Sequence, residues 1–342
     1  MAAMEDYGVV IGIDDYKNPP YGPLEGAKQD AQDFVDWLKS AGGGGLPNQN
    51  VDPFTKLSNA NGSDPTLSDL WSLLNKVRKL ATPVKKRIGR RLYLFLAGHG
   101  VSPLDLDEAG LVTIEAEQAL NPYLPGKDSA DAFCFASRFD EVLLFMDCCR
   151  VSDLLIEKIS NPFAEKPNIA AAGKVKRFYA FATAFGKTSR ENSVGGVVRG
   201  IFSRALIEGL KGGAPPDAQG RLTTTQLRAY LEAELKKVKL DGEEQVPKFP
   251  ASDEIVLVEG LALKRVTVNL TLAAPGIQSL VVLDGGNNLL PIIPEDEKAV
   301  PGGRQFSLPT GRTYMIQALD AGGKVVGTSL LKPDTEVANA TI

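Results

Sequence analysis

The chain has 342 residues, more than one domain of ordinary size usually holds, so two domains are expected. Its 43% of hydrophobic residues is typical of a globule with a substantial core, and no apolar stretch approaches the length of a membrane span. The formal net charge of −4 argues against non-specific binding to nucleic acid or to an anionic membrane. Three cysteines, two of them adjacent, do not make a disulfide framework, and Met1–Tyr7 is too short and acidic for a signal peptide. We therefore expect a reduced, cytoplasmic protein.

The first elements expected are a buried strand and an amphipathic helix. Val9–Ile13 is a short apolar run of the kind that is buried on both faces of a parallel sheet. After a turn-rich stretch, apolar residues recur at helical spacing: Leu24, Ala27, Ala31, Phe34 and Leu38. Asp30 lies on the edge of this apolar face, and periodicity alone predicts a solvated helix acid there.

The next stretch predicts an edge strand, a helix and a basic loop. Val51–Leu57 is expected at a sheet edge because it contains Pro53. Asp64–Leu80 has a helical apolar stripe of Leu70, Leu73, Leu74 and Val77. The basic residues of Lys85–Arg91 could suggest a nucleic-acid patch, but the acidic whole and the absence of aromatic residues favour a solvated loop.

Two apolar, strand-like runs each end in chemically active residues. Leu92–Ala97 is followed by Gly98, His99 and Gly100, and Val142–Met146 is followed by Asp147, Cys148 and Cys149. In open α/β sheets, ligands bind just beyond the carboxyl ends of such strands. Neighbouring strands lie about 4.8 Å apart, so the two strand ends could bring a histidine and a cysteine within reach of each other.

Strand alternation separates the two adjacent cysteines. Cys149 shares a face with Asp147, whereas Cys148 continues an apolar row and is expected in the core. His99 is the only histidine of the chain, and imidazole is the usual base that activates a thiol. An unrelated histidine at a turn beside a buried cysteine pair is the simpler alternative, but the matching positions at two strand ends favour a His99–Cys149 dyad.

These motifs resemble those of the caspase-like cysteine peptidases (peptidase C14 type), in which the histidine lies roughly fifty residues before the cysteine. The Asp-Cys-Cys form is most similar to the bacterial metacaspase branch. The resemblance covers about Tyr7–Glu259 and includes Ile11–Ile13, Leu24–Ala31, Glu191 and Gly200–Leu210. It implies a caspase-like, mostly parallel six-stranded sheet flanked by helices.

The resemblance also implies roles for particular residues. Asp30 and Asp147 match the aspartates that line the pocket for a basic residue before the scissile bond, so cleavage after Arg, then Lys, is expected rather than cleavage after Asp. Backbone N–H groups of Gly100 and Cys149 would form the oxyanion hole. The chain departs from the family after the nucleophile, where the usual His-Ser-Gly is replaced by Arg150–Ser152.

Activation is a further expectation. The 159–177 stretch reads as the connecting loop that is often cut in such enzymes, with Lys174, Lys176 and Arg177 as candidate self-processing positions. The alternative is that these basic side chains only keep a loop solvated.

The chemistry requires no cofactor or metal, and a lone histidine with adjacent cysteines is a poor zinc site. Some metacaspases need Ca²⁺ for activation, and Asp105–Glu108 could bind it. Protein substrates, and an activating protease or regulatory protein, are the expected partners.

The chain is expected to divide into a peptidase domain, 1–260, and a small antiparallel β-sandwich, 261–342. Val266–Leu272 and later segments alternate with period two between Pro and Gly turns. Two rival functions remain. A catalytically silent caspase-like scaffold, recruiting partners through the sandwich, would have no need to retain both His99 and Cys149. A flavodoxin-like binding domain would need a phosphate-binding glycine loop after the first strand, which the chain lacks.

Overall fold

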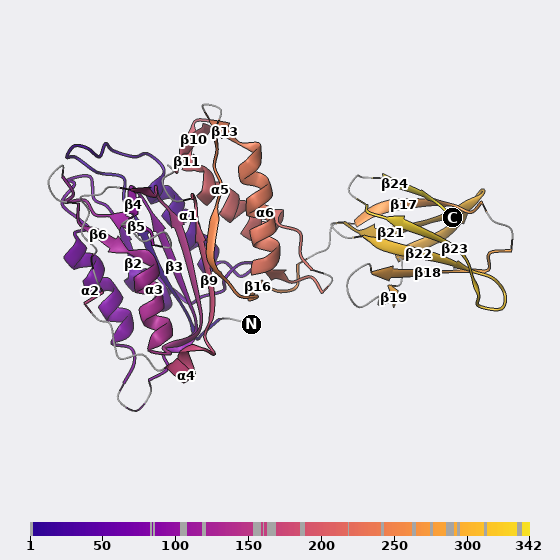
Figure 1. Ribbon diagram of the computed structural model, residues 1–342, viewed down its shortest axis with the longest axis horizontal. Helices are drawn as coiled ribbons and strands as arrows, with labels where there is room; N and C mark the ends of the chain where they lie inside the picture. Colours follow the sequence, from indigo (N-terminus) through magenta and orange to yellow (C-terminus); the bar gives the residue numbers. More distant parts are fainter. Residues whose placement is uncertain are drawn as a thin grey trace. The chain divides into compact units, whose positions relative to one another are not determined.

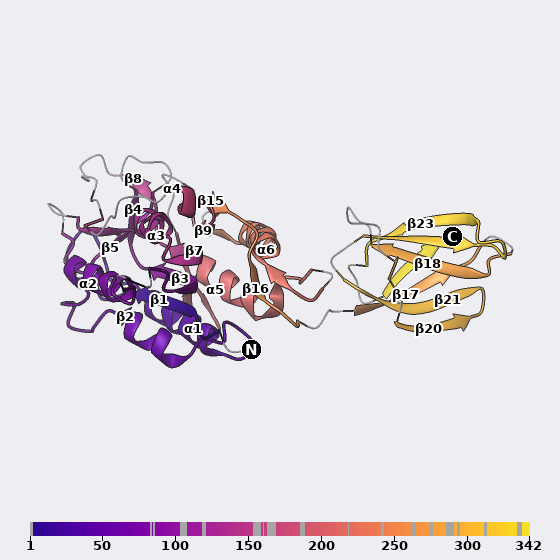
Figure 2. The same cartoon turned by 90° about the horizontal axis from the view of Figure 1, so that it is seen from below.

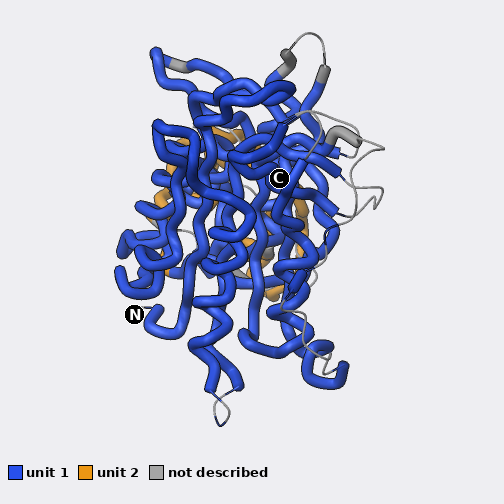
Figure 3. The backbone as a smooth tube through the Cα atoms, turned by 90° about the vertical axis from the view of Figure 1, so that its left-hand side faces the viewer, with its two compact units in different colours: residues 1–259 blue, residues 260–342 orange. Residues whose placement is uncertain are grey.

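The computed structural model describes residues 3–82, 84, 86–102, 108–117, 121–152, 159, 161–162, 169–184, 189–217, 219–240, 243–261, 265–273, 276–284, 291–292, 295–310, 313–333 and 337–342. The chain forms two compact units, Met1–Glu259 and Gly260–Ile342, shown in blue and orange in Figure 3. Within the described residues, no helix combines the length and the apolar character needed to cross a membrane.

The first unit is organised around a six-stranded sheet with the order β15-β9-β7-β3-β1-β2. All neighbouring pairs are parallel except β15–β9. The strands are β1 (Asp6–Gly12), β2 (Thr55–Leu57), β3 (Gly89–Ala97), β7 (Phe139–Asp147), β9 (Lys176–Phe181) and β15 (Lys248–Ser252). The predicted mostly parallel six-stranded sheet is therefore confirmed.

Helices cover both faces of this sheet. They are α1 (Ala27–Lys39), α2 (Leu67–Arg78), α3 (Gly126–Phe135), α4 (Ile169–Ala172), α5 (Ile201–Glu208) and α6 (Thr224–Lys237). Figures 1 and 2 show α2 and α3 on one side of the strands and α1 and α5 on the other. Phe34 of α1 stacks on Phe95 of β3 with ring centroids 4.7 Å apart, whereas Phe133 of α3 packs against Phe139 on the opposite face.

Capping interactions determine where two of these helices begin, and one of the two differs from the sequence expectation. The helix expected over Asp64–Leu80 begins at Leu67, because Thr66 and Asp69 form a capping box. Helix α3 runs from Gly126 to Phe135. Its first turn is capped from outside the segment, since the Glu108 carboxylate accepts the N–H groups of Lys127 and Asp128.

Short elements surround the main sheet. The expected edge strand is confined to Thr55–Leu57, because Asn48–Asn50 and Asp52–Phe54 form 3₁₀ turns (η1, η2) and Pro53 starts the second. The other short strands and the π-helical segment are β4 (Gly100–Ser102), β5 (Gly110–Val112), β6 (Tyr123–Pro125), β8 (Val151–Ser152), β10 (Glu191–Val194), β11 (Val197–Gly200), β12 (Leu222–Thr223), β13 (Lys239–Leu240), β14 (Glu243–Glu244), β16 (Val256–Val258) and η3 (Gly209–Gly213).

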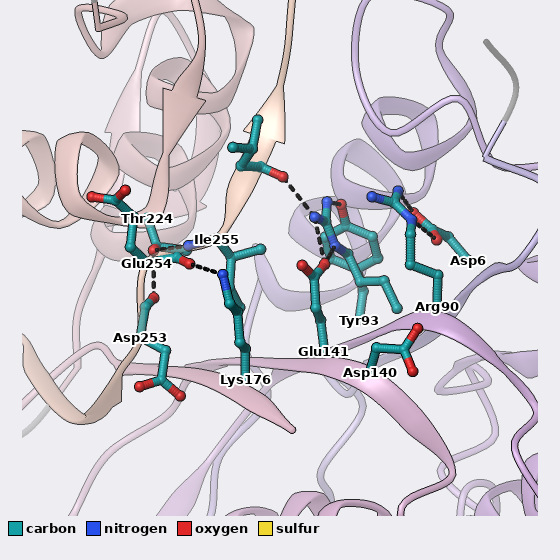
Figure 4. A network of polar contacts seen from close by, with 12 residues as sticks. Asp6, Arg90, Tyr93, Asp140, Glu141, Lys176, Thr224, Asp253, Glu254 and Ile255 are labelled. Atoms are coloured by element: carbon teal, nitrogen blue, oxygen red, sulfur yellow. Dashed lines mark hydrogen bonds and ion pairs between the residues drawn. The ribbon is translucent and has the colours of Figure 1, made fainter. Parts of the chain in front are cut away.

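A network of hydrogen bonds around the buried, charged Arg91 side chain connects the strands at the amino end of the sheet. Arg91 is only 2% exposed, and its guanidinium donates to the Glu141 carboxylate and the Val256 carbonyl, both at 2.6 Å, and to the Tyr93 hydroxyl at 2.8 Å. Figure 4 shows Glu141 and Tyr93 in this network, with Asp6 paired to Arg90 beside it. The network joins β3 and β7 to β16, so this end of the sheet is structural and the carboxyl end is left for a site.

The second unit contains two four-stranded sheets, β20-β21-β17-β24 and β19-β18-β22-β23. The strands are β17 (Arg265–Thr271), β18 (Ser279–Asp284), β19 (Pro291–Ile292), β20 (Glu295–Val300), β21 (Gly303–Pro309), β22 (Tyr314–Leu319), β23 (Val325–Leu331) and β24 (Val337–Thr341). Alternate residues of both sheets form one apolar core, with Val268, Phe306 and Ile316 among its fully buried members. The pairing is antiparallel except between β17 and β24, which run parallel.

Candidate active site

The register of β3 and β7 places the two sequence motifs side by side. Ala97, the last residue of β3, pairs with Asp147, the last residue of β7, and the Gly98 N–H donates to the Asp147 carbonyl at 3.2 Å. The two strands therefore stop at the same edge. Just beyond it, His99 and Cys149 line one cavity of about 160 Å³, together with Asp30 and Asp147.

Two glycines allow the histidine turn to pack closely against its neighbours. Gly98 has φ +151°, which L side chains rarely adopt, and a methyl group there would lie 2.7 Å from the Tyr16 hydroxyl. A methyl group on Gly100 would lie 2.6 Å from Cβ and 2.8 Å from Sγ of Cys148. Gly98 is therefore needed for the backbone of the turn and its packing against Tyr16, and Gly100 for the close packing of the turn against the cysteine segment.

The His99 imidazole is held by a backbone oxygen. Its Nε2 lies 2.8 Å from the Gly22 carbonyl, and a carbonyl can only accept, so Nε2 carries hydrogen and Nδ1 is the basic nitrogen of the neutral ring. The rings of Tyr16 and Tyr21 flank the imidazole, with centroids 4.7 and 5.3 Å away. Burial lowers the pKa of His99, so the imidazole is neutral and able to accept a proton near pH 7.

The Cys149 thiol is partly exposed and donates to the Ser189 carbonyl at 3.6 Å. Burial raises its pKa, so the resting sulfur is a thiol rather than a thiolate. No hydrogen bond between the described groups joins this thiol to the imidazole. Cys148 is 1% exposed and packs in the core, and Cys134 is also buried.

Asp147 is buried and accepts hydrogen bonds from neutral donors. Ser203 donates to its Oδ2 through both the backbone N–H, at 3.0 Å, and the hydroxyl, at 2.7 Å. The Ser189 hydroxyl donates to Oδ1 at 2.5 Å. Burial raises the pKa of Asp147, which these hydrogen bonds oppose.

Asp30 is 2% exposed and lies beside Asp147 in the cavity, not in solvent as helical periodicity predicts. Its Oδ2 accepts the Gly200 N–H at 2.8 Å, and its Oδ1 lies 3.5 Å from Nε of Arg199. Burial first, and then the charge of Asp147, raises the pKa of Asp30 to about 9. The structure therefore brings the four side chains expected at the cleft into one cavity: His99, Cys149, Asp30 and Asp147.

The β10–β11 hairpin closes the cavity from the later part of the chain. The Glu191 carboxylate accepts the N–H groups of Glu25, at 3.2 Å, and Gly26, at 2.8 Å, at the start of α1. Sequence reasoning missed Gly22, because a backbone carbonyl leaves no residue-type signal. It also gave no role to Ser189, Ser203 or Glu191, although Ser203 and Glu191 lie in segments that carried the resemblance.

Arg150 follows Cys149, at the position where the resemblance leads one to expect a histidine, and its side chain is buried. It is 2% exposed, and its guanidinium donates to the Glu108 carbonyl at 3.0 Å and to the Thr183 carbonyl at 3.5 Å. It also lies 5.0 Å from the centre of the Phe181 ring. The residue after Cys149 therefore connects the end of β7 to the end of β9 and to the segment before β5.

The candidate processing positions differ in their setting. Lys174 precedes β9, whereas Lys176 and Arg177 lie within β9 and pair with Glu141 and Val142 of β7. Lys176 also donates to the Glu254 carbonyl at 3.0 Å (Figure 4). A protease would have to open the sheet to cut after either of these two residues. Residues 160 and 163–168 of the connecting stretch lie outside the described residues.

The suggested Ca²⁺ stretch is described only at Glu108, since residues 105–107 lie outside the described part. The Glu108 oxygens accept the backbone N–H groups of Ala109, Lys127 and Asp128. They would have to give up these bonds to bind a cation, so this residue is a poor fit to a metal. Within the described part of the chain, no group of three or more His, Cys, Asp or Glu side chains is placed to hold a metal ion.

Comparison with known proteins gives a consistent family and fold. Residues 6–254 match the family model described as the caspase domain. A probable protease from a Desulfuromonadales bacterium is 26% identical over 222 residues, which are 61% of this chain and 26% of that relative, so the chain spans about a quarter of the relative's length. Caspase-1 from Spodoptera frugiperda, a solved structure, is similar with a TM-score of 0.51 and 14% identity, over 76% of this chain and 91% of that chain. This structural likeness concerns the fold.

Proposed function

The chain belongs to the caspase-domain family, and on that premise we propose that it is a cysteine endopeptidase that cleaves proteins after Arg, and less readily after Lys. The observation that carries the proposal is the shared cavity of His99 and Cys149, with the imidazole oriented by the Gly22 carbonyl. Family membership supports peptidase chemistry, and the two buried acids beside the nucleophile support the preference for a basic residue.

The resting pair is a neutral imidazole and a neutral thiol, so proton transfer belongs to the attack step. His99 Nδ1 accepts the Cys149 proton as Sγ adds to the substrate carbonyl carbon. The imidazolium then gives that proton to the leaving amine, and an acyl-enzyme remains. Water, deprotonated by His99, hydrolyses the thioester and regenerates the thiol. Nε2 keeps its hydrogen bond to Gly22 throughout, which holds the ring in one tautomer.

Backbone N–H groups of Gly100 and Cys149 are the proposed donors to the oxyanion. Both residues follow the strand ends that flank the cavity, and Gly100 packs directly against the cysteine strand. Donors fixed by the sheet need no reorganisation as charge develops on the carbonyl oxygen.

Asp30 and Asp147 form the proposed pocket for the basic residue. Two carboxylates favour the planar guanidinium of Arg, which presents several N–H donors, over the single ammonium of Lys. An aspartate side chain would meet like charge or an unpaired carboxyl group in the same place. Substrate selection thus depends on the charge of the pocket.

Activation by cleavage within the 159–177 stretch, by the enzyme itself or by an activating protease, is part of the proposal. Lys174 is the best placed of the three candidate positions, because Lys176 and Arg177 are paired within the sheet. A regulatory protein or Ca²⁺ could act on the same step. We place the activity in the cytoplasm, because catalysis requires a reduced Cys149 and all three cysteines are free thiols.

The test is hydrolysis of matched fluorogenic peptides that end in Arg, Lys or Asp by the purified chain, with Cys149→Ala as the inactive control. Cleavage after Arg and Lys that is lost in the variant supports the nucleophile and the pocket. Cleavage after Asp would still support Cys149 as the nucleophile, but it would refute the assignment of Asp30 and Asp147 to a pocket for a basic residue. If no peptide is cleaved, before or after limited proteolysis of the 159–177 stretch, the proposal that the chain is a peptidase is refuted. The alternative of a catalytically silent scaffold is then favoured.

A further inference from the structure

Two carboxylates face each other across a single glycine in the wall of the cavity. A methyl group built on Gly200 would overlap Oδ2 of Asp147 and would lie 3.0 Å from Oδ2 of Asp30. Both oxygens therefore lie next to one point, and both side chains are less than one-tenth exposed. Two ionised carboxylates this close in a buried setting repel each other strongly.

The hydrogen bonds are divided unequally between the two acids. Asp147 accepts three, from the hydroxyls of Ser189 and Ser203 and from the Ser203 N–H. Asp30 accepts one N–H, from Gly200. These hydrogen bonds stabilise the ionised form of Asp147 more than that of Asp30, so Asp30 holds a proton more readily.

Arg199, the cation that pairs with Asp30, is shared with a second acid. Arg199 of β11 is 3.5 Å from Asp30, but its Nε is closer to Asp33, at 2.9 Å. The remaining charged or titratable groups facing the pocket are Arg190 and Glu191 before and on β10, His99 after β3 and the Cys149 thiol after β7, whose pKa burial raises. Glu191 is occupied by two backbone N–H groups, and burial keeps His99 neutral. The pKa of Asp30, raised to about 9, agrees with this arrangement.

We propose that Asp30 and Asp147 share one proton while the pocket is empty, and that a cationic substrate side chain displaces this proton to solvent as it binds. The inference rests on the proposed function, since it takes the pocket to be the one that receives the basic residue. One positive charge enters as one leaves, so the net charge of the pocket is unchanged. A neutral side chain of the same shape leaves the proton in place.

The test is calorimetric titration of the full chain carrying Cys149→Ala with an Arg peptide, at about pH 7.5, in phosphate and in Tris buffer. These buffers differ in their enthalpy of protonation, so the difference in binding heat counts the protons released. We expect about one proton per Arg peptide, because a carboxyl with a pKa near 9 is protonated at this pH. The matched peptide with citrulline, which is neutral and nearly isosteric with arginine, should release none.

Asp30→Asn in the same background should abolish the proton release, whereas Asp36→Asn, an exposed acid on the same helix, should leave it intact. If the Arg peptide binds with equal heats in the two buffers, no proton is released and this inference is overturned. The proposed preference for a basic residue is not affected by that result. Proton release that persists in Asp30→Asn would place the proton elsewhere and also overturn the inference. Failure of the Arg peptide to bind, while an Asp peptide binds, would refute both the pocket assignment and this inference.

Discussion

Nε2 of His99 lies 2.8 Å from the carbonyl oxygen of Gly22, and this contact fixes which nitrogen can act as a base. Because burial lowers the pKa of His99, we expect kcat to rise with pH along an acidic limb centred below about 6.5, the usual value for histidine. Measurement of kcat from about pH 5 to about pH 8 with a saturating Arg peptide tests this. An acidic limb centred above 7 would show that the ring is stabilised as imidazolium instead.

Alkylation by iodoacetamide should report the neutral state of the thiol. We expect Cys149 to react in preference to Cys148 and Cys134, because it alone of the three is partly exposed. Its pKa is raised, so the alkylation rate should rise up to about tenfold per pH unit between about pH 7 and about pH 9. The measurement is modification rate by mass spectrometry. A rate already at its plateau near pH 6 would indicate a preformed thiolate–imidazolium pair.

Arg150→Met should reduce both stability and turnover. The substitution removes the hydrogen bonds that the buried guanidinium donates to the Glu108 and Thr183 carbonyls, although the Glu108 carbonyl still accepts the Ser102 hydroxyl. We expect a loss of about 2 to 4 kcal/mol in the free energy of unfolding. Arg150 acts through the position of Cys149 and does not contact substrate, so kcat should fall more than KM rises.

The matched control for that change is Arg228→Met. Arg228 also lies 5.0 Å from the centre of an aromatic ring, that of Phe249, but it is solvent-exposed and far along the chain from the dyad. Its loss should cost less than about 1 kcal/mol and leave kcat unchanged. Equal effects of the two substitutions on kcat would mean that Arg150 has no special influence on the site.

Glu108 should make stability depend on pH. Burial raises its pKa to about 7 in the folded chain, against about 4.3 when unfolded. Between these values the folded state binds a proton that the unfolded state lacks, so the free energy of unfolding falls as pH rises through this window. The contribution is on the order of 3 kcal/mol, lost by about pH 7.

Urea unfolding at several pH values, with Glu108→Gln and Glu115→Gln compared, isolates this contribution. The wild-type chain should lose stability relative to Glu108→Gln between about pH 4.5 and about pH 7. Glu115 is exposed, so its variant should follow the wild-type curve. A constant difference between wild type and Glu108→Gln across the range would refute the assignment.

The parts of the fold that follow from short-range pattern were predictable. The apolar runs ending at Ala97 and Met146 identified two central strands, and the shared position of their ends brought His99 and Cys149 to one edge. The resemblance added Asp30 to that site, where helical periodicity alone gave a solvated acid. Its burial arises from β11, which lies about 170 residues later in the chain and donates the Gly200 N–H.

Other features depend on contacts that no local pattern records. Glu108 caps the start of α3, and the carbonyl of Gly22 orients the imidazole of His99. Lys176 and Arg177 read as loop residues because they are charged, yet they pair with β7 at the sheet's amino end, where Glu254 and Asp253 lie nearby (Figure 4). Tertiary pairing overrides the local polarity there.

The parallel pairing of β7 with β9 has a thermodynamic consequence. A cut after Lys174 would divide the sheet so that β1, β2, β3 and β7 belong to one fragment and β9 and β15 to the other. The two fragments would still be joined by the β7–β9 hydrogen bonds and by the contacts of Glu191 and Gly200 with α1 and its start. Folding of the cut protein would then be a bimolecular association. Its melting temperature, constant for the intact chain, would rise with protein concentration, and dilution alone would separate the walls of the cavity that His99 and Cys149 line.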